Sequence, residues 1–94
     1  LKPDDPRAHR ELAAAHFNRQ QYEEAAEAYQ QAIRLRPDLD GAHLRLGDAF
    51  FNLGREVEAA AAYKQALRLK PTDAEARFAL ARLYVKQGRT AKVR

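Results

Sequence analysis

The sequence AAEAYQQAIRLRP at residues 25–37 recurs with few changes as AAAAYKQALRLKP at residues 59–71. The two copies lie 34 residues apart, a period that is typical of repeats formed by two helices each. A leucine and a proline with the same spacing, Leu1 and Pro3, stand one further period upstream of Leu35 and Pro37. The chain is therefore predicted to consist of copies of one helical hairpin.

Many other residues come into register when the sequence is shifted by one period. The first unit, residues 6–39, has His9, Leu12, Ala13, His16, Ala25, Tyr29, Ala32 and Pro37 at the recurring places. The second, residues 40–73, has His43, Leu46, Gly47, Phe50, Ala59, Tyr63, Ala66 and Pro71, and the third begins at Ala74 with Arg77, Leu80, Ala81, Tyr84 and Gly88. This pattern resembles the tetratricopeptide repeat family, whose units read W-x2-L-G-x2-Y, then A-x3-F, A and P. The chain departs from it with His or Arg at the tryptophan place and Glu56 where an aromatic residue is usual.

The resemblance implies an all-α fold, a right-handed superhelix (α-solenoid) of antiparallel helix-turn-helix repeats with about two and a half units. We expect one domain over residues 1–94, in which residues 1–5 are the tail of a preceding repeat, 6–39 and 40–73 are complete repeats, and 74–94 are a truncated third. The chain is therefore expected to be a fragment of a longer array.

Start and stop signals place the individual helices. Helices are predicted at about 6–19, 22–35, 40–53, 56–69 and 74–87, and a last helix should start a few residues before Arg94. Asp5 is predicted to cap the first helix, because Pro6 suits the first turn. Each second helix opens with acidic residues and closes with basic ones, which complements the helix dipole.

Small and apolar residues recur at helical spacing and predict the packing faces. On the first helices these are Ala8, Leu12 and Ala15, then Ala42, Leu46 and Ala49, then Ala76, Leu80 and Leu83. On the second helices they are Ala25, Ala28 and Ala32, and Ala59, Ala62 and Ala66, where small side chains let helices approach closely. Tyr29 and Tyr63 are predicted to fill the remaining core space rather than to bind a ligand.

Composition excludes several classes of protein. The 17 basic and 13 acidic residues are interleaved, so the net charge of +4 indicates a solvated mixed surface rather than a nucleic-acid site. The chain contains no cysteine and no apolar run of about 20 residues, so neither disulfides nor membrane insertion is expected. Frequent alanine and arginine hint at a bacterial source, and the compartment stays open, with the cytoplasm favoured.

Positions that differ between the units are free to serve a particular function. The family resemblance implies that such positions on the first helices line a concave groove that receives a partner's peptide or helix. We expect the binding residues to be Arg10, Phe17, Leu44, Arg45, Asp48, Phe51, Phe78, Arg82 and Lys86. Together with Val85, the apolar members would bind an apolar anchor, and the basic members would bind acidic residues beside it.

Two members of this set have an alternative role. Phe17 and Phe51 also recur from unit to unit, so they could simply seal adjacent helices. Leu44 and Phe78 are the better candidates, because the first unit has Arg10 at their position.

Two known variants of the family's groove do not match the sequence. The clamp that grips terminal carboxylates needs lysine, asparagine and arginine, where this chain has Arg10, Ala14, Arg45, Glu75 and Ala79. Only Arg10 is equivalent, and Glu75 would repel a carboxylate. Asn18 and Asn52 lie away from the place of the asparagine ladder found beside a glycosyltransferase, so a solvated role is expected for them.

No catalytic or metal site is predicted. His9, His16 and His43 occupy packing positions, and neither cysteines nor a convergent set of carboxylates completes a tetrahedral metal shell. The sequence also lacks a Ser-His-Asp arrangement and a phosphate-binding glycine loop. We expect no enzymatic activity and no cofactor.

Three functions remain open. The first is a scaffold that binds a protein or peptide partner in its groove. The second is a self-associating array that stacks through its exposed ends, because the face with Leu80, Leu83 and Tyr84 should be partly bare. The third is a non-catalytic arm that presents substrates to a larger enzyme.

Overall fold

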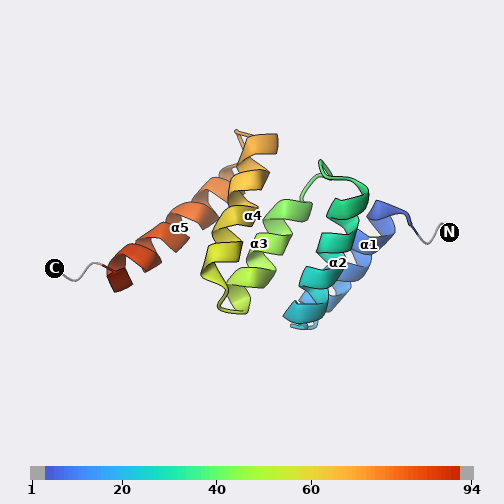
Figure 1. Ribbon diagram of the computed structural model, residues 1–94, viewed down its shortest axis with the longest axis horizontal. Helices are drawn as coiled ribbons and strands as arrows, with labels where there is room; N and C mark the ends of the chain where they lie inside the picture. Colours follow the sequence, from blue (N-terminus) through green and yellow to red (C-terminus); the bar gives the residue numbers. More distant parts are fainter. Residues whose placement is uncertain (1–3, 92–94) are drawn as a thin grey trace.

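The computed structural model describes the backbone of residues 4–91 and the side chains of residues 4–88, and this part of the chain is all-α. Its helices are α1 (Pro6–Asn18), α2 (Tyr22–Leu35), α3 (Ala42–Asn52), α4 (Glu56–Leu69) and α5 (Ala74–Ala91). Helices α1 and α2 form one antiparallel hairpin and α3 and α4 form the next, and α5 packs against α4 (Figure 1). The predicted helical-hairpin fold is confirmed.

Local signals in the sequence set the helix ends. The Asp5 carboxylate accepts a hydrogen bond of 3.0 Å from the Arg7 amide, as predicted for the cap of α1. Asp73 caps α5 in the same way, because its carboxylate accepts a bond of 3.1 Å from the Ala76 amide. The acidic first turns and basic last turns of α2 and α4 are also as predicted. Helix α3 begins at Ala42 rather than residue 40, because residue 41 has a left-handed backbone with φ of 80°.

The third unit differs from the prediction at its turn. A break was expected at Gly88, but α5 continues through it to Ala91. In the second unit the chain turns at Gly54, whose φ is 80°, and α4 then packs back along α3. Among the described residues, no helix follows α5 and packs along it as α4 packs along α3, so the packing that accompanies the turn in the second unit has no described counterpart here. The expected last helix, close to Arg94, lies outside the described residues.

The core is made of small residues around two tyrosines. Ala25, Ala32 and Ala59 have no exposed surface, and Tyr29 and Tyr63 are 2% and 0% exposed, which confirms that the tyrosines belong to the core. A Cβ atom on Gly47 would lie 2.6 Å from Cε1 of Tyr63, so only glycine lets α3 and α4 approach this closely with the ring in its present place. The recurring small residues thus set the distance between the helices.

The prediction for the packing face of α1 is wrong. Leu12 is 51% exposed, and Ala8 and Ala15 are exposed as well, whereas the equivalent Leu46 on α3 is only 8% exposed. Helix α2 packs against α3, but no described helix precedes α1. Burial of this face therefore depends on a neighbouring unit and not on the repeat itself.

Replacement of Gln20 by glycine should stabilise the chain. Gln20 stands one period before Gly54 and holds a φ of 62°, a left-handed backbone that costs a residue with a side chain about 1 kcal/mol. We expect Gln20→Gly to raise the free energy of unfolding by about that amount, and Gly54→Gln to lower it. Urea denaturation followed by circular dichroism measures both; no change in either variant would contradict the assignment.

Candidate functional site

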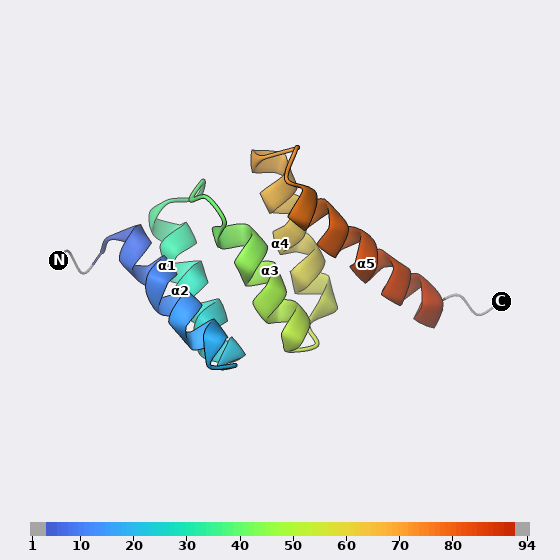
Figure 2. The same cartoon turned by 180° about the vertical axis from the view of Figure 1, so that it is seen from behind.

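A hollow of about 390 Å³ lies where the first helices of the three units meet. Figure 2 shows these helices, α1, α3 and α5, on the near side of the molecule. The residues that line the hollow are Phe17, Asp48, Phe51, Asn52, Glu75, Phe78, Ala79 and Arg82. Five of the nine residues that the sequence nominated therefore come together in one place, which we call the groove.

Two phenylalanines and an arginine form the centre of the groove. The Arg82 guanidinium carbon lies 4.9 Å from the centre of the Phe51 ring and 5.9 Å from that of Phe78, within the range of cation–π attraction. Phe78 is 68% exposed. No carboxylate of residues 4–88 lies within ion-pair distance of Arg82. This Phe–Arg cluster thus presents an apolar ring and a guanidinium whose positive charge no described carboxylate neutralises.

The other nominated cations are already engaged. Arg10 donates a hydrogen bond of 2.9 Å to the carbonyl oxygen of Asp40. The Lys86 ammonium lies 2.8 Å from the Glu56 carboxylate and 5.1 Å from the centre of the Phe51 ring. The charge of Lys86 is thus paired with a carboxylate of the chain, and one nitrogen of Arg10 is held by the backbone.

A polar network connects the core to the groove wall. The Tyr63 hydroxyl donates a hydrogen bond of 2.6 Å to Oδ1 of Asp48. Nη1 of Arg45 donates to Oδ2 of the same carboxylate at 3.0 Å and to Oε2 of Glu75 at 3.3 Å. Burial raises the pKa of Tyr63, and the hydrogen bond to Asp48 raises it further. Burial lowers the pKa of Arg45, but its carboxylate partners outweigh this effect and raise it overall.

Phe17 and Phe51 both line the groove and pack against the core, so the two roles considered for them coexist. Both are half-buried and line the groove. The Phe17 ring also packs edge-on against Tyr22 with 5.1 Å between ring centres, so it helps to close its own hairpin.

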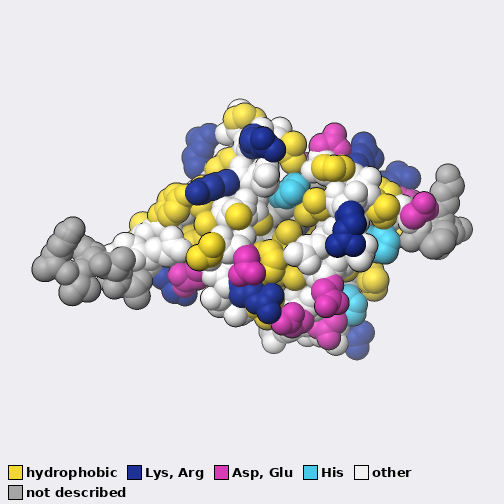
Figure 3. Space-filling view, in the orientation of Figure 1, with side chains coloured by type: hydrophobic (Ala, Val, Ile, Leu, Met, Phe, Trp, Pro, Cys, Tyr) yellow, Lys and Arg dark blue, Asp and Glu magenta, His cyan; other side chains and the backbone are white. Residues whose placement is uncertain are grey.

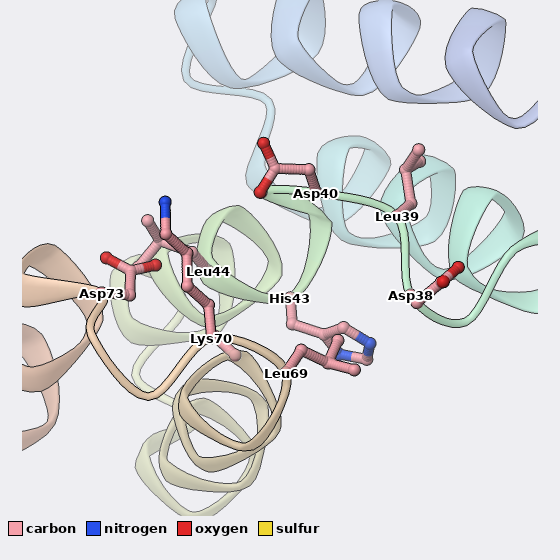
Figure 4. A pocket seen from close by; sticks show the side chains of 10 residues that line it. Asp38, Leu39, Asp40, His43, Leu44, Leu69, Lys70 and Asp73 are labelled. Carbon is pink, nitrogen blue, oxygen red and sulfur yellow. The ribbon is translucent and has the colours of Figure 1, made fainter.

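Leu44 was expected among the binding residues of the groove, but its side chain is buried and lies elsewhere. Its side chain is 5% exposed, whereas Phe78 at the same repeat position is 68% exposed. Figure 4 shows Leu44 in a different, smaller pocket of about 190 Å³, close to Lys70 and Asp73. Leu44 belongs to the middle one of the three units, whereas Phe78 belongs to the last described helix.

The apolar face expected to be partly bare at the end of the array is exposed at Tyr84 but not at Leu83. Leu83 has no exposed surface and Leu80 is half-buried, because α5 packs both against the core. Tyr84 remains 46% exposed, and the Lys64 ammonium lies 5.9 Å from the centre of its ring.

The acidic groups and histidines show no metal-binding arrangement. The carboxylates of Asp38, Asp40 and Asp73 lie apart around the smaller pocket (Figure 4). His43 donates a hydrogen bond of 2.9 Å to the Pro37 carbonyl, and His16 donates one of 2.8 Å to the Gln21 side chain. Within the described residues, no three His, Cys, Asp or Glu side chains are grouped so that they could hold a metal ion.

The opposite face of the molecule is a mixed-charge surface. Acidic and basic side chains are interspersed over α2 and α4 in Figure 3. In the described part of the chain, no helix combines the length and the apolar character that a membrane span requires. The groove is therefore the stronger candidate for a specific site.

Three residues that line the groove were not predicted to bind a partner, namely Asn52, Glu75 and Ala79, and Glu75 is the charged one. The sequence marks Glu75 only as a position that varies between the units. The equivalent residue is Arg7 in the first unit and Gly41 in the second. The partner of Glu75, Arg45, lies thirty residues away in the sequence, so only the fold brings the two together.

Comparisons with known proteins agree with this architecture. A family model described as TPR repeat matches residues 15–54 and 57–88. The chain belongs to the tetratricopeptide repeat family. No curated protein matches it.

Solved structures of the family have the same arrangement of helices. One is the crystal structure of MamA, with a TM-score of 0.90 and 26% identity over 94% of this chain. Another is the first TPR of Spaghetti (RPAP3) bound to the HSP90 peptide SRMEEVD, with a TM-score of 0.89 and 26% identity over 93% of this chain. The chain spans 52% of the first structure and 69% of the second.

Removal of the Tyr63 hydroxyl should cost more stability than removal of its counterpart in the first unit. Tyr63→Phe deletes a hydrogen bond to a carboxylate, worth about 2 kcal/mol, whereas the Tyr29 hydroxyl has no hydrogen-bond partner among the described residues. Tyr29→Phe is therefore the matched control, and urea denaturation compares the two. Equal losses of unfolding free energy would show that the bond to Asp48 contributes nothing.

Proposed function

We propose that this chain is a protein-interaction scaffold whose concave groove binds a partner's peptide or helix through one apolar anchor and an adjacent acidic residue. The observation that carries the proposal is the Phe–Arg cluster, in which an exposed aromatic ring lies beside an arginine with no carboxylate partner among residues 4–88. Covering the ring is favourable because it removes apolar surface from water. An acidic residue of the partner would compensate the guanidinium for the hydration that it loses on burial.

The apolar part of the site supplies most of the binding energy. Phe78 is 68% exposed, and burying a side chain of this size contributes about 2 kcal/mol. Phe51 and Phe17 extend the same surface, so an aliphatic or aromatic anchor would contact several rings within the hollow. Anchors of this kind dominate the energetics of most interfaces.

The charged part of the site sets the orientation of the partner. The planar guanidinium of Arg82 lies against Phe51 and can donate two parallel hydrogen bonds to one carboxylate. The related structure with an acidic peptide bound supports a partner of this type for the fold. Here the residues Arg10, Ala14, Arg45, Glu75 and Ala79 differ from a two-carboxylate clamp, and we assign the carboxylate to Arg82 instead.

Self-association through exposed ends is a second candidate. Leu12 is 51% exposed and lies with His9, His16 and Ala28 along an open hollow of about 500 Å³ on α1 and α2. A second copy of the chain could cover this face, as α2 covers the equivalent face of α3. A substrate-presenting arm of a larger enzyme would use the same groove as the scaffold.

Loss of the Phe–Arg cluster should abolish selective peptide binding. Peptides selected from a random library on the wild-type chain should bind Phe78→Ala and Arg82→Glu at least about tenfold more weakly, because each change removes one half of the recognition. Val57→Ala and Lys64→Glu on α4 are the matched controls and should bind as the wild type does. Fluorescence anisotropy gives the dissociation constants, and circular dichroism checks that helicity is unchanged.

Three results would count against the scaffold. They are failure to recover any peptide, equal binding to all five proteins, and a wild-type chain that sediments as a dimer with Leu12 covered. The last result would favour self-association.

A further inference from the structure

We propose that Glu75 is an internal competitor for acidic partners, so that it limits the groove to one partner carboxylate. This inference rests on the proposed function, because it concerns the same groove. The preference of the groove for the number of acidic residues in its partner would then depend on the contact between Arg45 of the second unit and Glu75 of the third.

The geometry around Arg45 carries the inference. A single nitrogen, Nη1 of Arg45, contacts Asp48 at 3.0 Å and Glu75 at 3.3 Å. Asp48 and Arg45 both lie on α3, whereas Glu75 lies in the first turn of α5. Glu75 therefore reaches α3 from the next unit and shares Nη1 of Arg45 with Asp48.

The two carboxylates are held very differently. The Asp48 side chain is 21% exposed, and its other oxygen accepts the Tyr63 hydroxyl at 2.6 Å, so it is fixed to the core. The Glu75 side chain is 61% exposed, and it has no second partner among residues 4–88. Exposed ion pairs contribute little to stability, so another carboxylate can replace Glu75 at small cost, whereas Asp48 stays.

The position of Glu75 makes this replacement relevant to binding. Glu75 lines the same hollow as Phe78 and Arg82. A peptide anchored there brings its first carboxylate to Arg82. A second carboxylate that paired with Arg45 would compete with Glu75 for this guanidinium and would lie close to the negative charges of Glu75 and Asp48. The groove should therefore favour peptides with one acidic residue next to the apolar anchor.

The repeat itself does not require an acidic residue at this place. The equivalent residues are Arg7 in the first unit and Gly41 in the second. A second cation near the cluster is also paired within the chain, since the Lys86 ammonium, which lies 5.1 Å from the centre of the Phe51 ring, contacts Glu56 at 2.8 Å. Carboxylates of the chain itself thus pair with two of the cations near the Phe–Arg cluster, Arg45 and Lys86.

Glu75→Gln tests the inference directly. A random peptide library is panned separately on the wild-type chain and on Glu75→Gln, and the acidic residues in the recovered peptides are counted. We expect Glu75→Gln to select peptides with an additional acidic residue, and these peptides to bind it about fivefold more tightly than they bind the wild type. Adding Arg45→Gln to the variant should remove this gain, because the freed guanidinium is then gone.

Glu58→Gln is the matched control. Glu58 is exposed in the first turn of α4, so its replacement makes the same change in net charge and in helix-end charge on the opposite face. It should select the same peptides as the wild type.

Two results would overturn the inference, and they differ from each other. If the wild type and Glu75→Gln select peptides of equal acidity that Phe78→Ala fails to bind, the groove binds peptides but Glu75 does not compete. If neither protein selects any peptide that depends on Phe78, the proposed function itself fails, and the competitor role fails with it.

Discussion

The close approach of α3 and α4 at Gly47 is the constraint on which the groove depends. A Cβ atom at this position would lie 2.6 Å from the Tyr63 ring, so the ring can occupy its place only because residue 47 has no side chain. From there the Tyr63 hydroxyl reaches Asp48, and Asp48 in turn holds Arg45. A packing requirement in the core thus fixes the position of a charged group on the functional surface.

The first unit shows what happens without this arrangement. Ala13 and Ala14 stand where the second unit has Gly47 and Asp48, and the Tyr29 hydroxyl has no described hydrogen-bond partner. Tyr29 instead borders a hollow of about 320 Å³ together with Ala14 and Arg45. The two units therefore present different walls to the groove, because Ala13 and Ala14 of the first unit cannot provide what Gly47 and Asp48 provide in the second.

The sequence was sufficient for the features that depend on nearby residues. The period, the Asp5 cap, the charged helix ends and the core tyrosines all follow from contacts within one hairpin. The errors concern residues whose surroundings come from other units. Leu44 is buried and Leu12 is exposed because coverage depends on which unit lies next to each, and the repeat pattern does not distinguish these cases. Gly88 likewise keeps a helical backbone, and the described residues contain no following helix that packs along α5 as α4 packs along α3.

Part of the groove was also visible in the sequence. Phe17, Asp48, Phe51, Phe78 and Arg82 were nominated because their positions vary or carry bulky groups on one helix face, and the fold brings them to one hollow. The pairing of Arg45 with Glu75 could not be predicted from one helix face, because the two residues lie thirty positions apart in the sequence and on different helices. Its detection needs the angle between units, which local periodicity does not supply.

Amide chemical-shift mapping by NMR tests the central claim, that the groove is the binding surface, most directly. The labelled chain is titrated with a peptide selected on it, and the shift of each assigned amide is followed. Our account predicts the largest shifts on α3 and α5 around Phe51, Phe78 and Arg82, with smaller ones near Phe17. Shifts concentrated on the outer faces of α2 and α4, or around Leu12 on α1, would contradict it.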